Sequence, residues 1–579
     1  MGSPELRVRF QPSGQEARVA PGTTLLAAAH WAGTTVDSTC GGYGTCGLCR
    51  LRVLEGDVPA SPEDSQHISR DELADGWRLA CRAELEGDTV CQVPAPAEHP
   101  RSVVEGIQRA IAVEPRVRIE ELESGGEGGD AKAIVCGSWQ IDVIANDRVP
   151  QPFGVALDLG TSTVAGALVD LVDGTIVAAA SIVNGQVAAG ADVISRAAYA
   201  RSRPGGALEL QGMAVDTMNQ LVARLGVAAS VFPGNVYECV VAGNSIMLHL
   251  LLGVDPYPLS VAPFETVFDE PLDVAAADLR VDTVAKDRRG PQLAIHPQAR
   301  LQSFPMIGAY AGGDTVAGLH ATDIVRGDRP RLLIDLGTNT EVALGYDGRV
   351  VVASAPAGPA FEGGGVRCGM AAVEGAVARV KLGPAIELEV IGGGAPRGLC
   401  GSGLVDAVAE LRWAGLLDRS GRLGSAEELT GNPLADRLEE IEGARAFRLA
   451  EGIYIGQRDI RELQSAIAAV AAAVRIVLGH EKVEPHELAD VYLAGSFGAA
   501  LDPRSARSLG LVPPVSENAV RGVGNAAIEG AKAALLSFRE REVAFQIPFH
   551  TEYLELSGHP DFNDTFMAAM TFPDLEGLG

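Results

Sequence analysis

The chain has 579 residues, of which 47% are hydrophobic and 21% charged, enough apolar material for the cores of several domains. Its 47 Lys and Arg residues against 75 Asp and Glu residues give a formal net charge of −28, which argues against nucleic acid and anionic membranes as partners. The nine cysteines are not spaced as a disulfide framework, and no apolar signal segment opens the chain. The composition therefore predicts a cytoplasmic protein that does not span a membrane.

Residues 1–94 are predicted to form a compact β-grasp unit. Apolar and polar residues alternate over Leu6–Phe10 and again over Glu16–Ala20, which predicts a β-hairpin. A helix capped by a threonine is expected over Leu25–Ala32, because an apolar run follows the sequence Pro-Gly-Thr-Thr. Two further strands are expected, at residues 48–53 and 89–93.

A glycine-rich loop in this unit carries three thiols, Cys40, Cys46 and Cys49, in the spacing C-x5-C-x2-C, and Cys81 follows at a distance. Four thiolates can hold an iron–sulfur cluster, and plant-type [2Fe–2S] sites use a similar grouping of three cysteines plus one. Glycine allows backbone N–H groups to approach the negatively charged sulfides. The alternative is a structural zinc site, but such sites usually contain two C-x2-4-C pairs, and only Cys46 and Cys49 form one.

The order of strands, helix, cysteine loop and late Leu-Ala-Cys resembles the [2Fe–2S] ferredoxins, with the loop spacing of their adrenodoxin-like branch. This resemblance implies an electron-transfer module whose metal ligands are Cys40, Cys46, Cys49 and Cys81. It also implies that the fold of the first 94 residues is α+β.

Two short segments separate this module from the rest of the chain. Prolines predict a stiff linker over residues 95–113, and the glycine-rich stretch Glu123–Asp130 predicts a hinge. Residues 114–150 leave room for a small or reduced middle segment with one or two strands.

An internal repeat marks residues 151–579: an apolar strand, an aspartate and a Gly-Thr turn occur at Asp158 and again at Asp335. Such a turn offers N–H and hydroxyl donors to phosphate, and an aspartate can hold Mg²⁺ or its water. Two such hairpins can bind a triphosphate from opposite sides of a cleft. The predicted phosphate-binding residues are Gly160, Thr161, Ser162 and Thr163 in the first copy and Gly337, Thr338 and Asn339 in the second.

Pepsin-like aspartic proteases also carry two Asp-x-Gly-Thr turns, whose carboxylates share a proton. Those enzymes favour the sequence Asp-Thr-Gly, whereas Leu159 and Leu336 follow the aspartates here. The sequence therefore favours a nucleotide site over a protease site.

A third element, the apolar strand Asp490–Ala494, ends in a turn with Gly495, Ser496 and Gly498. Together with the two hairpins it resembles the nucleotide-binding motifs of the acetate and sugar kinase, Hsp70 and actin (ASKHA) superfamily, in which the hairpins match the two phosphate motifs and this turn the adenosine motif. The resemblance implies an α/β ATPase with two lobes, at about 151–325 and 326–579. A further turn is expected either to assist metal or phosphate binding or to serve only as a tight strand-to-helix turn; its residues are Gly312, Gly313 and Asp314.

A [2Fe–2S] module followed by an actin-like ATPase resembles the reductive activators of corrinoid-dependent methyltransferases and O-demethylases, and the segments Gly358–Gly363 and Gln457–Glu462 extend this likeness. The resemblance implies that one electron passes to an inactive Co(II) corrinoid protein and restores Co(I), coupled to ATP and Mg²⁺. It implies an upstream reductase or ferredoxin as electron donor, with Asp158 and Asp335 as the catalytic residues. A homodimer is an open alternative to a monomer.

One departure and two alternatives accompany this interpretation. Members of the family usually carry a substantial middle domain, for which residues 114–150 are too few. The chain is alternatively an ATP-regulated electron-transfer protein with a non-corrinoid acceptor, or a small-molecule kinase of the ASKHA superfamily with a redox-sensing ferredoxin domain.

Overall fold

The computed structural model describes residues 6–12, 14–32, 34, 36, 49–94, 106–122, 131–145, 150–190, 192–280, 290–383, 385–441 and 443–575. Two of the predicted cluster ligands, Cys40 and Cys46, lie outside these residues, as do the hinge Glu123–Asp130 and linker residues 95–105.

The N-terminal domain is a five-stranded sheet in the order β2-β1-β5-β3-β4. Its strands are β1 (Leu6–Gln11), β2 (Gln15–Val19), β3 (Arg50–Glu55), β4 (Trp77–Leu79) and β5 (Thr89–Gln92). Helix α1 (Leu25–Trp31) contributes Leu25 to the buried core beside Phe10, and Thr24 Oγ1 accepts a hydrogen bond from the N–H of Ala27. Two short helices precede β4: α2 (Asp64–His67) and α3 (Arg70–Ala74). The predicted β-grasp fold is confirmed.

A small antiparallel sheet of three strands follows, although the sequence predicts only one or two. It consists of β6 (Val117–Leu122), β7 (Ala131–Cys136) and β8 (Trp139–Ala145). Strand β6 was missed because only Val117 is buried and the other five side chains are exposed, so the segment lacks an apolar face.

The first large sheet has the strand order β11-β10-β9-β12-β14-β13. Its strands are β9 (Phe153–Leu159), β10 (Thr163–Asp170), β11 (Ile176–Val183), β12 (Val236–Gly243), β13 (Asp273–Ala275) and β14 (Arg300–Ser303). Helix α5 (Gly206–Ala229) packs against β10 and β11, while α12 (Ala526–Leu536) packs against β9 and β12. Two shorter helices complete this lobe: α4 (Val193–Ser202) and α6 (Ser245–Leu251).

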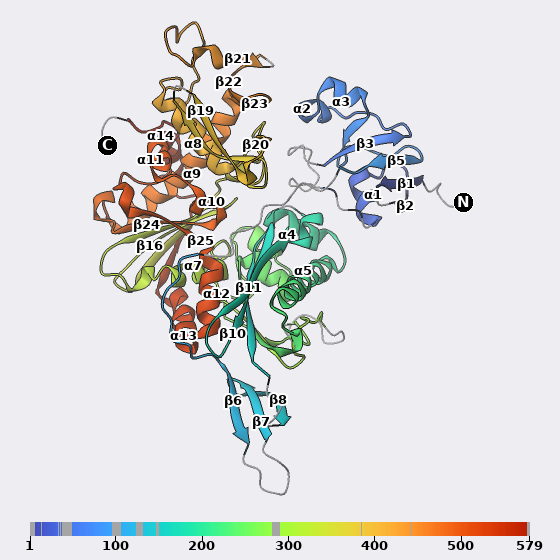
Figure 1. The fold of residues 1–579 in the computed structure, drawn as a ribbon, viewed down its shortest axis with the longest axis vertical. Coiled ribbons are helices and arrows are strands. Elements are labelled where there is room, and N and C mark those ends of the chain that lie inside the picture. Colours follow the sequence, from blue (N-terminus) through green and yellow to red (C-terminus); the bar gives the residue numbers. More distant parts are fainter. Residues whose placement is uncertain are drawn as a thin grey trace.

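The second large sheet has the order β25-β24-β15-β16-β17-β26. Its strands are β15 (Arg331–Asp335), β16 (Thr340–Tyr346), β17 (Arg349–Ala355), β24 (Asp490–Ala494), β25 (Val520–Gly524) and β26 (Thr551–Leu554). Helix α7 (Gly313–Ala321) pairs with α12, and one apolar core joins both helices to buried side chains of both sheets. Figure 1 shows this helix pair at the junction of the two lobes.

The remaining elements belong mainly to the C-terminal part of the chain. They are the strands β18 (Ala376–Leu382), β19 (Ile386–Val390), β20 (Gly398–Leu399), β21 (Leu438–Ile441), β22 (Ala444–Ala450) and β23 (Ile453–Gly456), and the helices α8 (Gly401–Trp413), α10 (Gly495–Ala500), α11 (Pro503–Leu509), α13 (Phe538–Gln546) and α14 (Phe562–Ala569).

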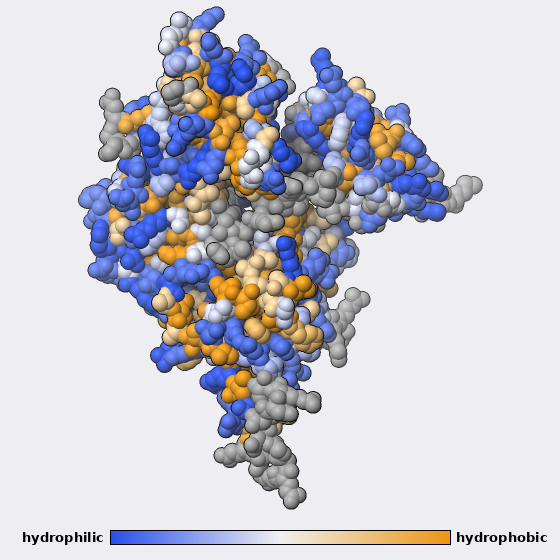
Figure 2. Space-filling view, in the orientation of Figure 1, coloured by the Kyte–Doolittle hydropathy of each residue, from blue (hydrophilic) through white to orange (hydrophobic). Residues whose placement is uncertain are grey.

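Helix α9 (Gln457–Glu481) packs against β16 and β17. Among the described residues it is the one helix long and apolar enough to cross a membrane, and 78% of its most apolar window is buried inside the protein. Its side chains, such as Leu463 and Val470, belong to the core of the second lobe. On the face shown in Figure 2, hydrophilic residues are interspersed with hydrophobic ones.

Candidate functional site

The first candidate site lies in the N-terminal domain, where Cys49 and Cys81 come together. Cys49 directly precedes β3 and Cys81 follows β4, and the antiparallel pairing of these strands brings both thiols to one end of the sheet. Their Sγ atoms are 3.3 Å apart, too far for a disulfide bond of about 2.05 Å. The Oδ1 atom of Asp64 accepts a hydrogen bond from the N–H of Leu79 and so supports the strand that leads to Cys81.

This thiol pair fits an iron–sulfur cluster. Both cysteines are almost fully buried, with exposed fractions of 1% for Cys49 and 6% for Cys81, and two sulfurs this close can ligate one iron. The structure thus brings together two of the four predicted ligands, while the other two lie outside the described residues.

The second candidate site is formed by the two aspartate hairpins. Asp158 lies in β9 and Asp335 ends β15. The predicted phosphate-binding residues form the turns into β10 and β16, except Thr163, which is the first residue of β10. The carboxylates are close enough for that of Asp158 to raise the pKa of Asp335 by repulsion, in addition to the larger effect of burial. The two halves of the repeat, far apart in sequence, therefore meet at one place.

Three residues that the sequence analysis missed hold the first turn. Asn244 Nδ2 donates a hydrogen bond to Thr161 Oγ1 at 3.1 Å, and Asn184 Nδ2 donates to the carbonyl of Gly160 at 2.9 Å. Arg196 Nη2 donates to the carbonyl of Thr161 at 2.5 Å. Burial lowers the pKa of Arg196 to about 9, so this side chain remains positively charged at neutral pH directly behind the turn.

Asp314 joins the two hairpin aspartates. Burial raises the pKa of Asp158 to about 6, and that of both Asp314 and Asp335 to about 7, with repulsion from Asp158 as the second cause for the latter two. The turn before α7 is also tight, because a Cβ on Gly312 would lie 2.5 Å from Cα of Asn244. This turn is therefore sterically tight, and it also delivers a carboxylate to the two hairpins.

Glu341 is a fourth acidic residue at this site. Burial raises its pKa well above the usual range, and repulsion from Asp314 and Asp335 adds to that effect. The Ser354 hydroxyl donates to its Oε1 at 3.2 Å. Its only signal in the sequence is a single glutamate in the otherwise apolar run that follows Thr340.

The carboxylates suit a metal that arrives together with phosphate. In the described part of the chain, no group of three or more His, Cys, Asp and Glu residues is arranged to hold a metal ion. Mg²⁺ in nucleotide sites is usually bound by one or two carboxylates together with substrate phosphates and water, and needs no such protein cage. The fit to Mg²⁺ with a nucleotide is therefore good, because buried carboxylates with raised pKa values gain most from a bound cation.

The predicted adenosine turn lies next to the second hairpin. Strand β24 runs parallel to β15, which places Ala494 opposite Asp335. Gly495 has a φ of +84°, and a Cβ there would lie 2.9 Å from the carbonyl oxygen of Leu336, so glycine is required. Gly498 lies in helix α10, and the side chain of Ser496 is outside the described part.

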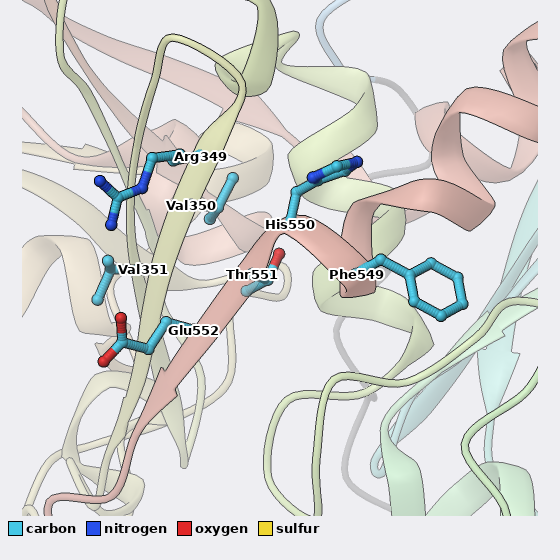
Figure 3. Close-up of a pocket in the computed structure, with 7 residues that line it drawn as sticks. All are labelled: Arg349, Val350, Val351, Phe549, His550, Thr551 and Glu552. Atoms are coloured by element: carbon cyan, nitrogen blue, oxygen red, sulfur yellow. The ribbon is translucent and has the colours of Figure 1, made fainter.

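Two pockets lie elsewhere, and none of the predicted site residues lines them. One, of about 300 Å³, is bordered by β17, β26 and the segment before β26, as Figure 3 shows. The other, of about 820 Å³, lies between β8 and loops of the first lobe.

Comparisons with protein families divide the chain into three parts. Residues 8–86 match the 2Fe-2S iron-sulfur cluster binding domain, residues 153–327 the RACo middle region, and residues 329–577 the C-terminal domain of RACo, the ASKHA domain. The first match supports an iron–sulfur cluster over a zinc site. The second covers the residues that the sequence analysis assigned to the first lobe, about 151–325.

Individual proteins agree with these family matches. "Corrinoid activation enzyme RamQ" of Eubacterium limosum is 34% identical over 452 residues, which cover 76% of this chain and 74% of that protein. "[Co(II) methylated amine-specific corrinoid protein] reductase" of Methanosarcina barkeri is 25% identical over 72% of this chain and 77% of its own. The solved structure "Reductive activator for corrinoid,iron-sulfur protein" is 29% identical, covers 99% of both chains and gives a TM-score of 0.71.

Proposed function

Because the chain belongs to the family of corrinoid activation enzymes, we propose that it is an ATP-dependent reductive activator. In this function one electron passes from a [2Fe–2S] cluster to an inactive Co(II) corrinoid protein and restores Co(I). One observation carries the proposal: a buried thiol pair in a ferredoxin fold and two aspartate hairpins with mutually repelling carboxylates occur in the same chain.

The redox half of the proposal rests on Cys40, Cys46, Cys49 and Cys81 as cluster ligands. The cluster, when bound, supplies the single electron. The β3–β4 pair fixes the last two thiols at one end of the sheet, and their burial excludes water from them. An upstream reductase or ferredoxin delivers electrons to this module.

ATP is required for an energetic reason. Co(I) is a strong reductant, so electron transfer from a [2Fe–2S] centre at roughly −400 mV runs uphill. Each ~100 mV of mismatch costs about 2.3 kcal/mol per electron. A nucleotide supplies free energy of this size when it binds one state of the activator–corrinoid complex more tightly than the other.

In the ATPase half, Asp158 and Asp335 hold Mg²⁺ and orient the water that attacks the γ-phosphate, and Asp314 assists them. The phosphates are bound by Gly160, Thr161, Ser162, Thr163, Gly312, Gly313, Gly337, Thr338 and Asn339. The adenosine is bound by Gly495, Ser496 and Gly498. The charged Arg196 behind the first turn favours negatively charged phosphate at this place.

The proposed division of the chain follows from these roles. Residues 1–94 are the redox module, 95–113 its linker, 114–150 a small middle segment, and 151–579 the ATPase. The lobes of the ATPase extend over about 151–325 and 326–579, although α12 of the second lobe packs on the first sheet.

The test is a reduction assay with a Co(II) corrinoid protein. The protein is chemically reduced, mixed with the corrinoid protein, and the Co(I) absorbance is followed with and without Mg²⁺ and ATP. We expect Co(I) to form only with ATP, and the variant Asp335→Asn to lose this ATP-dependent formation while its cluster still accepts an electron. Equal Co(I) formation with and without ATP would refute the coupling, and none with any corrinoid protein encoded nearby would refute the acceptor.

A further inference from the structure

The turn Val523–Asn525, formed by the last two residues of β25 and the residue before α12, connects the nucleotide site to another part of the chain. Asn525 is the N-terminal cap of α12, where its Oδ1 accepts a hydrogen bond from the N–H of Ile528 at 2.9 Å. Its Nδ2 donates to Asp158 Oδ2 at 2.7 Å. One side chain therefore caps a helix and holds one carboxylate oxygen of the first hairpin.

This hydrogen bond joins the two lobes at the nucleotide site. Asn525 directly follows β25, which pairs with β24 in the second sheet, whereas Asp158 belongs to β9 in the first. Because β24 also pairs with β15, the strand that ends in Asp335 is part of the same sheet as this turn. A shift of β25 therefore changes where Asn525 stands relative to Asp158.

The same turn also contacts the linker that leads from the redox module, at Gly106 and Ile107. Gly106 forms an antiparallel bridge with Gly524, and the N–H of Ile107 donates to the carbonyl of Val523 at 2.9 Å. The N–H of Gly106 donates to Glu529 Oε1 in α12 at 2.8 Å. The fit is close: a Cβ on Gly106 would lie 2.7 Å from the carbonyl oxygen of Val523 and 2.8 Å from that of Asn525.

A second set of contacts holds the linker at Arg109, a few residues further along the chain. Arg109 donates to Asp323 Oδ1 at 3.1 Å and to Glu540 Oε2 at 2.8 Å, so it links the segment that follows α7 to helix α13. These contacts are mostly buried, because the Arg109 side chain is 19% exposed. The end of the linker therefore cannot move without disturbing the helices at the lobe junction.

We propose that Asn525 is a positioning residue for Asp158, and that the fastened end of the linker, Gly106 and Ile107, holds the turn that carries it. This inference rests on the proposed function, because that function places Asp158 at the ATP site. The linker of the redox module is then a structural part of the nucleotide site. Because coupling between two sites is reciprocal, nucleotide that fixes Asp158 also fixes the linker.

The positioning role is tested by the variants Asn525→Asp and Asn525→Ser. Both keep an oxygen that caps α12 and both lose the N–H donor to Asp158. We expect the thermal midpoint of the nucleotide-free protein to stay near wild type in Asn525→Ser and to fall in Asn525→Asp, because the new carboxylate repels that of Asp158. The visible spectrum of the cluster should stay near wild type in both variants. ATP affinity, measured by calorimetry, and kcat/KM for ATP hydrolysis should both fall about tenfold to hundredfold. The fall should be larger in Asn525→Asp, because its new carboxylate faces that of Asp158.

Two outcomes separate this inference from the proposed function. Wild-type ATP affinity and kcat/KM in Asn525→Ser would overturn the positioning role while leaving the function intact. A wild-type protein that neither binds nor hydrolyses ATP would overturn the function itself, and the inference with it.

The linker part is tested by Gly106→Ala, with Gln108→Ala as the matched control because Gln108 is exposed on the same segment. We expect weaker ATP binding in Gly106→Ala and wild-type binding in the control. Hydrogen exchange in the wild-type chain gives a measurement free of any folding defect: the amide of Ile107 exchanges more slowly with Mg²⁺ and ATP. Unchanged exchange at Ile107, or equal ATP affinity in the two variants, would overturn the linker's role.

Discussion

At the residue scale, the main electrostatic feature is the acidic centre of Asp158, Asp314 and Asp335. Removal from water disfavours each negative charge and their mutual repulsion adds to this, so the pKa values rise to between about 6 and about 7. Folding therefore binds protons here, and the resulting loss of stability is absent below pH 3.8, grows as the pH rises, and is complete above about pH 7. A cation bound with the nucleotide reverses this effect.

The variant Asp314→Asn tests this account. Asparagine has the shape of aspartate without its charge, so we expect a higher thermal midpoint of the nucleotide-free protein at pH 8 and a smaller gain at pH 5. ATP affinity in the presence of Mg²⁺ should fall in the same variant. Calorimetric scans at the two pH values measure the first effect, and a gain of equal size at both would contradict it.

The cluster ligands offer a second test at this scale. Cys49→Ala and Cys81→Ala should each abolish the visible absorbance of a [2Fe–2S] cluster, because each removes one ligand. Cys91 is a matched control in the same domain: it is a fully buried core residue of strand β5 and lies outside the predicted ligand set. Retention of the spectrum in either ligand variant, or its loss in Cys91→Ala, would contradict this ligand set.

At the scale of elements, a buried ion pair fixes helix α13 to the first sheet. Arg541 Nη1 donates to Glu238 Oε1 in β12 at 2.7 Å, with exposed side-chain fractions of 5% and 0%. Arg116, just before β6, lies 3.6 Å from the same carboxylate and adds the small middle sheet to this contact. One carboxylate thus connects three parts of the chain.

Removal of Arg541 should therefore be costly. We expect Arg541→Met to lower the free energy of unfolding by about 3–5 kcal/mol, because it leaves the buried charge of Glu238 without its closest partner. Arg539, on the same helix, pairs with Glu114 at the surface, so Arg539→Met should cost at most about 1 kcal/mol. Denaturant unfolding of both variants measures the difference, and equal losses would count against the special role of the buried pair.

At the scale of the whole molecule, the redox module and the ATPase are joined by a short tether. Residues 95–105 separate the last described residue of the module from Gly106, and eleven residues span at most about 40 Å. The acceptor's corrinoid must therefore come within that reach, plus the width of the redox module itself, of the lobe junction. The proposed function thus requires the cluster and the ATP site to act within one assembly.

A mixing experiment tests this requirement. Cys81→Ala should lose electron transfer and keep ATP hydrolysis, while Asp335→Asn should lose ATP hydrolysis and keep a cluster that accepts an electron. Separately purified and then mixed in equal amounts, the two variants should give no ATP-dependent Co(I). Recovery of Co(I) formation on mixing would show that hydrolysis in one molecule serves the cluster of another.

The sequence by itself determined the two halves of this protein and their order. The cysteine spacing, the repeated Asp-Leu-Gly-Thr turns and the glycine turn after Asp490–Ala494 are short contiguous patterns, and local backbone chemistry determines what each can do. The β-grasp and ASKHA folds follow from them. Strand β6 shows the limit of this approach. It has only one buried side chain, so it has no apolar face from which a strand could be predicted.

Only the tertiary structure decided which residues stand behind those motifs. Asn525 meets Asp158 across 367 positions, and the linker at Gly106 reaches Glu529 across 423. Contacts at such separations arise from how two sheets and a shared helix pair pack together, and they leave no spacing or periodicity in the chain. For the same reason the sequence placed α12 in the second lobe, whereas packing set this helix against the first sheet.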